Sequence, residues 1–119
     1  MSQQLPLRPL FWMGDSLKTL RSFPDPVRDD IGHSLYIVQG GITPHDAKPL
    51  KGIDSGVFEI VARHDGETYR AVYAVKIGQH VYVLHVFQKK SKSGIKTPQA
   101  DIDLIVKRLK EAKRREGMQ

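Results

Sequence analysis

Two consecutive strands that are apolar on both faces constrain the fold most. They are Tyr69–Ile77 ("YRAVYAVKI") and Val81–Gln88 ("VYVLHVFQ"), and a short turn joins them. A strand that faces water on one side alternates apolar with polar residues, because successive side chains point to opposite faces. These two strands do not alternate, so we expect both to be central or covered. Val57–Arg63 precedes them across an Asp-Gly loop, which completes an antiparallel run of three strands.

The N-terminal part of the chain predicts one strand and two helices. Leu7–Met13 is interpreted as an edge strand, because Pro9 cannot donate a hydrogen bond to a neighbouring strand. The segment "SLKTLRSF" predicts a short helix. The segment "DPVRDDIGHSLYIVQGG" predicts a second helix, with Asp25 as its N-cap and Pro26 at its first position. We expect the two helices to form an antiparallel hairpin.

A last predicted helix follows the three strands. Thr97 is placed to cap it and Pro98 to occupy its first position. Its apolar stripe consists of Ile102, Ile105, Leu109 and Ala112. The order strand, two helices, three strands and helix is typical of an α+β fold, here an antiparallel-rich sheet of about four strands with helices on one face. We expect a single domain over residues 1–119.

The positive charge of the chain lies in its second half. Residues 1–55 carry six Lys/Arg and six Asp/Glu, whereas residues 56–119 carry thirteen and seven, which accounts for the net charge of +6. Such asymmetry fits a surface that binds a polyanion or an acidic partner, and it also fits a basic domain without that role. The chain has no cysteine, no signal-peptide pattern and no apolar run of membrane-spanning length, so we expect a cytoplasmic protein.

Arg70 and a lysine cluster are the main candidate site residues. Arg70 opens an otherwise apolar strand, where an unpaired charge is costly to bury. It would either pair with a carboxylate such as Glu59 or hold a phosphate through its guanidinium. The cluster precedes the last helix, whose N-terminus favours anions, and it is either a solvated loop or a phosphate site. Its members are Lys89, Lys90, Lys92 and Lys96.

Regular alternation along the strands sorts the remaining candidates by face. It places Arg70 on the same side as Lys76, and His85 on the same side as Val83 and Lys89. We interpret His85 as an ordinary strand histidine. The other histidines lack metal-ligand spacing and the serines lack a neighbouring base, so the sequence predicts neither a metal site nor a hydrolase triad.

A set of motifs in a fixed order resembles one known family. The motifs are "FEI", the strand "YRAVY", the segment "VLHVFQKKSK" before Thr97-Pro98, and the helix "ADIDLIVKRLKE". Over nearly its whole length the chain resembles the phage-related HigB-type toxins of the RelE/ParE superfamily. The resemblance implies a small α+β toxin of a type II toxin–antitoxin pair, neutralised by a helix-turn-helix antitoxin in a hetero-oligomer. Many members cut mRNA on the translating ribosome without a metal or other cofactor.

The resemblance also implies an active surface made of basic side chains. Arg70, with Arg63, would stabilise the charge of the phosphorane, and Lys89 or Lys90 would transfer protons. Glu59 would orient an arginine or act as a base. Further contacts to RNA phosphates would come from Lys92, Lys96, Lys76 and Lys51.

Two other functions remain open at this point. Some relatives with the same fold poison DNA gyrase. If the chain acts as they do, it is a ParE-like inhibitor that binds protein through its basic surface and cleaves no RNA. A protein that keeps the fold without any toxicity is the third alternative.

Overall fold

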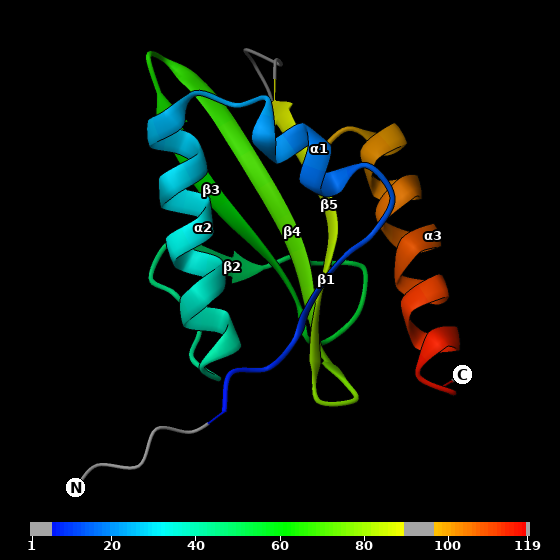
Figure 1. Ribbon diagram of the computed structural model, residues 1–119. Coiled ribbons are helices and arrows are strands. Elements are labelled where there is room, and N and C mark those ends of the chain that lie inside the picture. Colours follow the sequence, from blue (N-terminus) through cyan, green and yellow to red (C-terminus); the bar gives the residue numbers. More distant parts are fainter. Residues whose placement is uncertain (1–5, 90–96, 119) are drawn as a thin grey trace, which may run out of the picture.

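The computed structural model describes residues 6–89 and 97–118, and its elements follow the predicted α+β order (Figure 1). The strands are β1 (Leu10–Trp12), β2 (Ala47–Pro49), β3 (Val57–His64), β4 (Glu67–Ile77) and β5 (His80–Lys89). The helices are α1 (Ser16–Arg21), α2 (Asp25–Gln39) and α3 (Gln99–Arg115). No helix in the described part of the chain is both long and apolar enough to cross a membrane.

The sheet has five strands in the order β1-β5-β4-β3-β2. As predicted, β3, β4 and β5 are antiparallel neighbours and the N-terminal strand lies at an edge, where β1 runs parallel to β5. At the other edge β2 pairs with β3 and adds a strand to the four expected. Its three residues lie in a Pro- and Gly-rich segment that indicates a linker, and only the neighbouring strand makes them extended.

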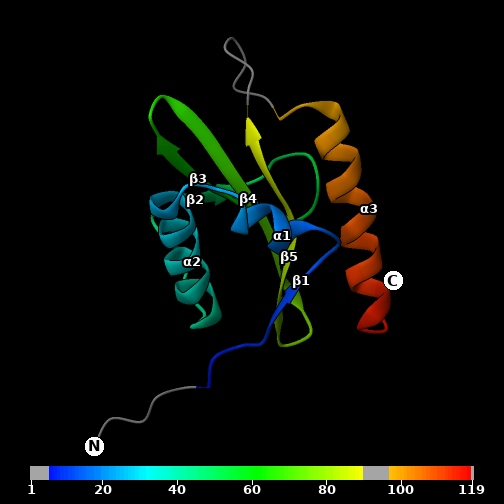
Figure 2. The ribbon, with the colours of Figure 1, turned by 45° about the horizontal axis from the view of Figure 1, so that its top comes forward.

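Helices cover both faces of the sheet, which corrects the prediction that they lie on one face (Figure 2). The core beneath α2 includes Ile31, Leu35, Ile60 and Tyr73. The core beneath α3 includes Val72, Leu84, Ile105 and Leu109. Because β4 and β5 are apolar on both faces, burial of both faces is what removes their side chains from water.

The two N-terminal helices do not form the predicted hairpin. The six-residue α1 packs chiefly against β5, whereas α2 packs chiefly against β3. Two helix starts also differ from the prediction by one residue, since the N-cap positions hold Pro24 rather than Asp25 and Pro98 rather than Thr97. The hydroxyl of Thr97 makes another contact, which belongs to the site described below.

A bulge in β5 changes which side chains face α3. Val72 pairs with His85, but the next pair is Tyr73 with Val83, so Leu84 is an extra residue on β5. Val83 belongs to the core beneath α2 and Leu84 to the core beneath α3. The prediction that His85 shares a face with Val83 is therefore wrong, because the bulge interrupts the alternation between them.

Replacing Ile105 with alanine should destabilise the protein strongly. Ile105 is 0% exposed under α3, so Ile105→Ala should lower the free energy of unfolding by about 2–5 kcal/mol. Ile42→Ala is the matched control, because Ile42 is 65% exposed and its truncation should change that free energy by no more than about 0.5 kcal/mol. Urea unfolding followed by circular dichroism measures both. Equal effects of the two substitutions would contradict the packing of α3 on the sheet.

Candidate functional site

Three buried charged side chains lie together on the face of the sheet that α3 covers. Glu59 comes from β3, Arg70 from β4 and Lys89 from β5, and their exposed fractions are 1%, 6% and 6%. The strand register places them close to one another, because Val61 pairs with Arg70 and Thr68 with Lys89. Nη1 of Arg70 donates a hydrogen bond to Oε1 of Glu59. The structure thus contains the ion pair that was one of the two alternatives for Arg70. We call these three residues the charged triad.

Three side chains from separate parts of the chain contact the carboxylate of Glu59. Besides the Arg70 guanidinium, the Thr97 hydroxyl at the start of α3 donates to its Oε2 over 3.3 Å. Nζ of Lys48, on β2, lies 4.0 Å from its Oε1. Since both carboxylate oxygens have neighbours of this kind, Glu59 is held in position to orient the Arg70 guanidinium.

Lys89 is the cation of the triad that has no hydrogen-bond partner among the described residues. Its Nζ is buried without an acceptor, and the same is true of Nε of Arg70. Burial, and then the positive charge of Arg70, lower the pKa of Lys89 from its ordinary value of 10.5. Buried donors without acceptors are costly. An anion with several oxygen atoms, such as a phosphate group, could accept hydrogen bonds from both.

A second polar network, which the sequence did not predict, ties α3 to β5. Nε2 of His85 lies 2.7 Å from Oδ1 of Asp101, and its Nδ1 lies 3.5 Å from Nη1 of Arg108. Arg108 also donates to the carbonyl of Leu84 and to Asp15, each over 2.9 Å. Both ring nitrogens of His85 therefore have partners, and the bulge in β5 supplies two of the groups that fasten the helix. No cluster of three His, Asp or Glu side chains that could hold a metal ion occurs within residues 6–89 and 97–118.

The other predicted site residues do not join the charged triad. Arg63 lies on the same face but is exposed at the outer end of β3, where it lines an open pocket beside β2. Lys76 is exposed in the irregular end of β4, six residues from Arg70 and thus roughly 20 Å along the strand. Lys51 is exposed near Val57, at the same distant end of the sheet. Three predicted residues lie outside the described part of the chain: Lys90, Lys92 and Lys96.

The chain belongs to the family described as Phage derived protein Gp49-like, which it matches over residues 18–110. This family is part of the RelE/HigB-type toxin group. The matched part contains the whole charged triad, the bulge in β5 and the first 12 of the 17 residues of α3. Membership in this family suggests a toxin of a toxin–antitoxin pair. No curated protein matches the chain.

The buried ammonium of Lys89 should make stability depend on pH in the alkaline range. Because the pKa of Lys89 is lowered in the native state, this side chain binds more protons in the unfolded chain as the pH approaches 10.5, and its own contribution to the free energy of unfolding rises with pH there. Lys89→Met removes this group, so the unfolding free energy of the wild type minus that of the variant should rise toward pH 10.5. Urea titrations across this range measure that difference. Lys107→Met, which removes an exposed cation, controls for net charge. Parallel pH curves for wild type and Lys89→Met would contradict the assignment.

Proposed function

We propose that this protein is the toxin of a type II toxin–antitoxin pair, that it cuts mRNA on translating ribosomes without a metal ion, and that a helix-turn-helix antitoxin neutralises it in a hetero-oligomer. Membership in the Gp49-like family supports the toxin assignment. One structural observation supports RNA as the substrate. The buried Lys89 ammonium and the Nε of Arg70 lie on one face of the sheet without acceptors among the described residues, and an RNA phosphate carries such acceptors.

Cleavage of RNA by its own 2′-hydroxyl requires three roles. A base takes the hydroxyl proton, the 2′-oxygen attacks the adjacent phosphorus, and the bond to the 5′-oxygen breaks as that oxygen gains a proton. Negative charge accumulates on the phosphorane oxygens between these events, and positioned donors lower the barrier by stabilising it. Cationic side chains can supply this stabilisation, so the proposal requires no metal.

The geometry supports a division of these roles within the charged triad. Arg70 stabilises the phosphorane, while Glu59 orients its guanidinium. Lys89 transfers a proton. Its lowered pKa increases the fraction of the neutral amine, which is the form that can accept a proton. Arg63 adds a cation at the exposed rim of the same face. His85 receives no proton-transfer role, since Asp101 and Arg108 occupy both of its ring nitrogens.

Removing either cation of the triad should abolish toxicity. Arg70→Ala should slow mRNA cleavage in a translating extract by about 10²–10³-fold, because it deletes a charge-stabilising donor. Lys89→Met should have a similar effect, and it leaves the pair of Arg70 and Glu59 in place. Arg21→Ala is the matched control, since Arg21 is exposed on α1. Induced expression in a bacterial host should arrest growth for wild type and Arg21→Ala only. Unfolding curves establish that each variant is folded, and full growth arrest by both triad variants would refute the site.

Primer extension on mRNA from growth-arrested cells distinguishes the two kinds of toxin. Cuts at defined positions within codons are expected, because cleavage on the ribosome follows the reading frame. Intact messages together with DNA damage would instead support the ParE-like gyrase inhibitor, which would use the same basic face to bind protein. Expression of the wild type without any growth defect would support a non-toxic protein that keeps the fold.

A further inference from the structure

The outer edge of β1 offers hydrogen-bonding groups that no described strand uses. On its inner side, the Met13 N–H donates to the Val83 carbonyl and the Val81 N–H donates to the Pro9 carbonyl, each over 2.9 Å. Alternate residues of a strand point their backbone groups to the same neighbour. The N–H and C=O groups of Leu10 and Trp12 therefore point away from β5, and β1 is the last described strand on this side of the sheet.

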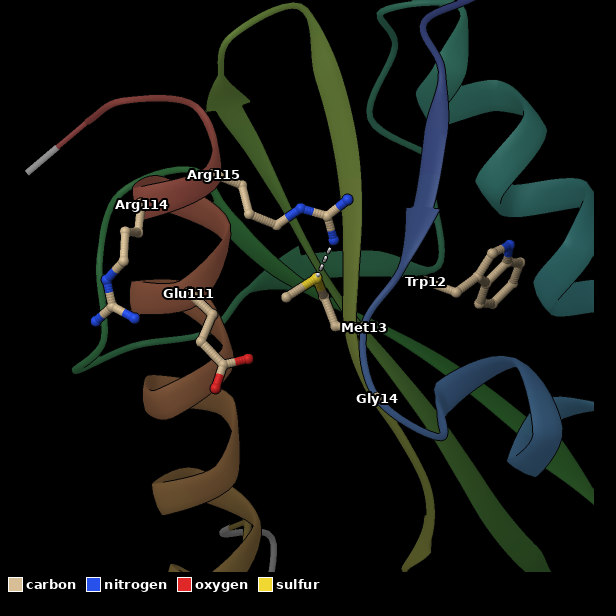
Figure 3. Close-up of a pocket in the computed structure, with 6 residues that line it drawn as sticks. All are labelled: Trp12, Met13, Gly14, Glu111, Arg114 and Arg115. Atoms are coloured by element: carbon tan, nitrogen blue, oxygen red, sulfur yellow. Dashed lines mark hydrogen bonds between the residues drawn. The ribbon is translucent and has the colours of Figure 1, made fainter.

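A pocket lies at each end of this free edge. The pocket at the C-terminal end opens between the chain that leaves β1 and the last turns of α3 (Figure 3), and its lining residues are Trp12, Met13, Gly14, Glu111, Arg114 and Arg115. The pocket at the other end is lined by residues that precede β1, among them Leu7, Arg8 and Pro9, together with Gln39, Gly40 and Gln79. The backbone N–H and C=O of Arg8 bond to Gln39 at the end of α2, so the free stretch runs from Leu10 to Trp12, with one pocket beside each of its ends.

The charge around the edge is positive. Arg8 lies at one end, and Arg114 and Arg115 lie at the other, where Glu111 lines the same pocket and Glu116 also interacts electrostatically with Arg115. None of the three arginines has a carboxylate within 4.0 Å among the described residues. Figure 3 shows Arg115 reaching from the helix toward Met13, and its guanidinium carbon lies 5.4 Å from the centre of the Phe11 ring. This cation is held in place beside the strand and remains available to an acidic group.

We propose that the outer edge of β1 binds an extended, acidic segment of a partner protein, which adds a strand to the sheet. A polypeptide supplies the alternating donors and acceptors that Leu10 and Trp12 require, whereas the phosphate groups of RNA supply only acceptors. Acidic side chains at the ends of the segment would pair with the arginines. A second copy of this chain fits poorly, because each copy carries a net charge of +6 and would bring like charges together. The inference does not depend on ribonuclease activity.

Hydrogen exchange can test which backbone groups the segment uses. The probe is an acetylated heptapeptide in which glutamate and valine alternate, and the matched probe replaces each glutamate with lysine. In the free protein the amides of Leu10 and Trp12 should exchange rapidly, and the glutamate peptide should protect them. The amides of Phe11 and Met13 face β5 and should be protected with or without peptide. Equal protection by the lysine peptide, or none by the glutamate peptide, would overturn the proposal.

Two pairs of variants test the edge and the charge separately. Leu10→Pro removes an outward N–H, so it should weaken binding of the glutamate peptide roughly tenfold relative to Leu10→Ala, which keeps that donor. Arg114→Glu should weaken binding more than Lys107→Glu, because both residues are exposed on α3 but only Arg114 lines the pocket. Unchanged affinity in Leu10→Pro and Arg114→Glu would overturn the proposal. Two other results would also overturn it. One is a dimer of the protein, seen by sedimentation, that the glutamate peptide does not dissociate. The other is protection of the Leu10 and Trp12 amides from hydrogen exchange by an RNA oligonucleotide instead of the peptide.

Discussion

The structure depends on two adjacent strands, β4 and β5, that are apolar on both faces. Such strands are stable only when both faces are shielded from water, which requires cover on each side of the sheet. On one side α1 and α2 provide this cover, and on the other side α3 does. The position of α3 has a chemical consequence as well, because the residues just before it place Thr97 beside Glu59 and its first turn places Asp101 beside His85. The same packing that buries the second core therefore builds the polar end of that face.

Burial of the charged triad is difficult to explain by stability alone. Removing two charges from water costs free energy that their attraction only partly offsets, so apolar residues of similar size often stabilise a protein as well or better. Here Arg70 and Glu59 offset each other, but Lys89 brings a third buried charge without a hydrogen-bond partner among the described residues. Buried titratable groups whose pKa is shifted by burial and a neighbouring charge, as that of Lys89 is, are common at functional sites. The arrangement fits a site that is completed by an anionic ligand, which is the basis of the ribonuclease proposal.

Sequence patterns predicted the elements well and the site only partly. The order of strands and helices follows from hydrophobic periodicity and turn residues, both of which are local. The pairing of Arg70 with Glu59 was one of the two alternatives left open for a charge on a central strand, and the structure contains it. By contrast, the pair of His85 and Asp101 was missed, since it depends on a bulge at Leu84 and on the face that α3 covers. The only signals in the sequence were a histidine near the end of a strand and an acidic residue in the first turn of the next helix.

The distribution of the basic residues shows the same limit. Lys76 and Lys89 were both assigned to one phosphate-binding surface, yet they lie at opposite ends of the sheet, because β4 and β5 run antiparallel and each is long. The amino-acid sequence alone determines most of the strands and helices, with β2 as an exception, that the central strands need cover, and that the second half is basic. Only the tertiary structure decided which charged side chains meet, on which face of the sheet they do so, and which of them lie beside the free edge of β1. The physical reason is that periodicity acts over neighbouring residues, whereas strand register, bulges and helix placement depend on packing between residues far apart in the chain.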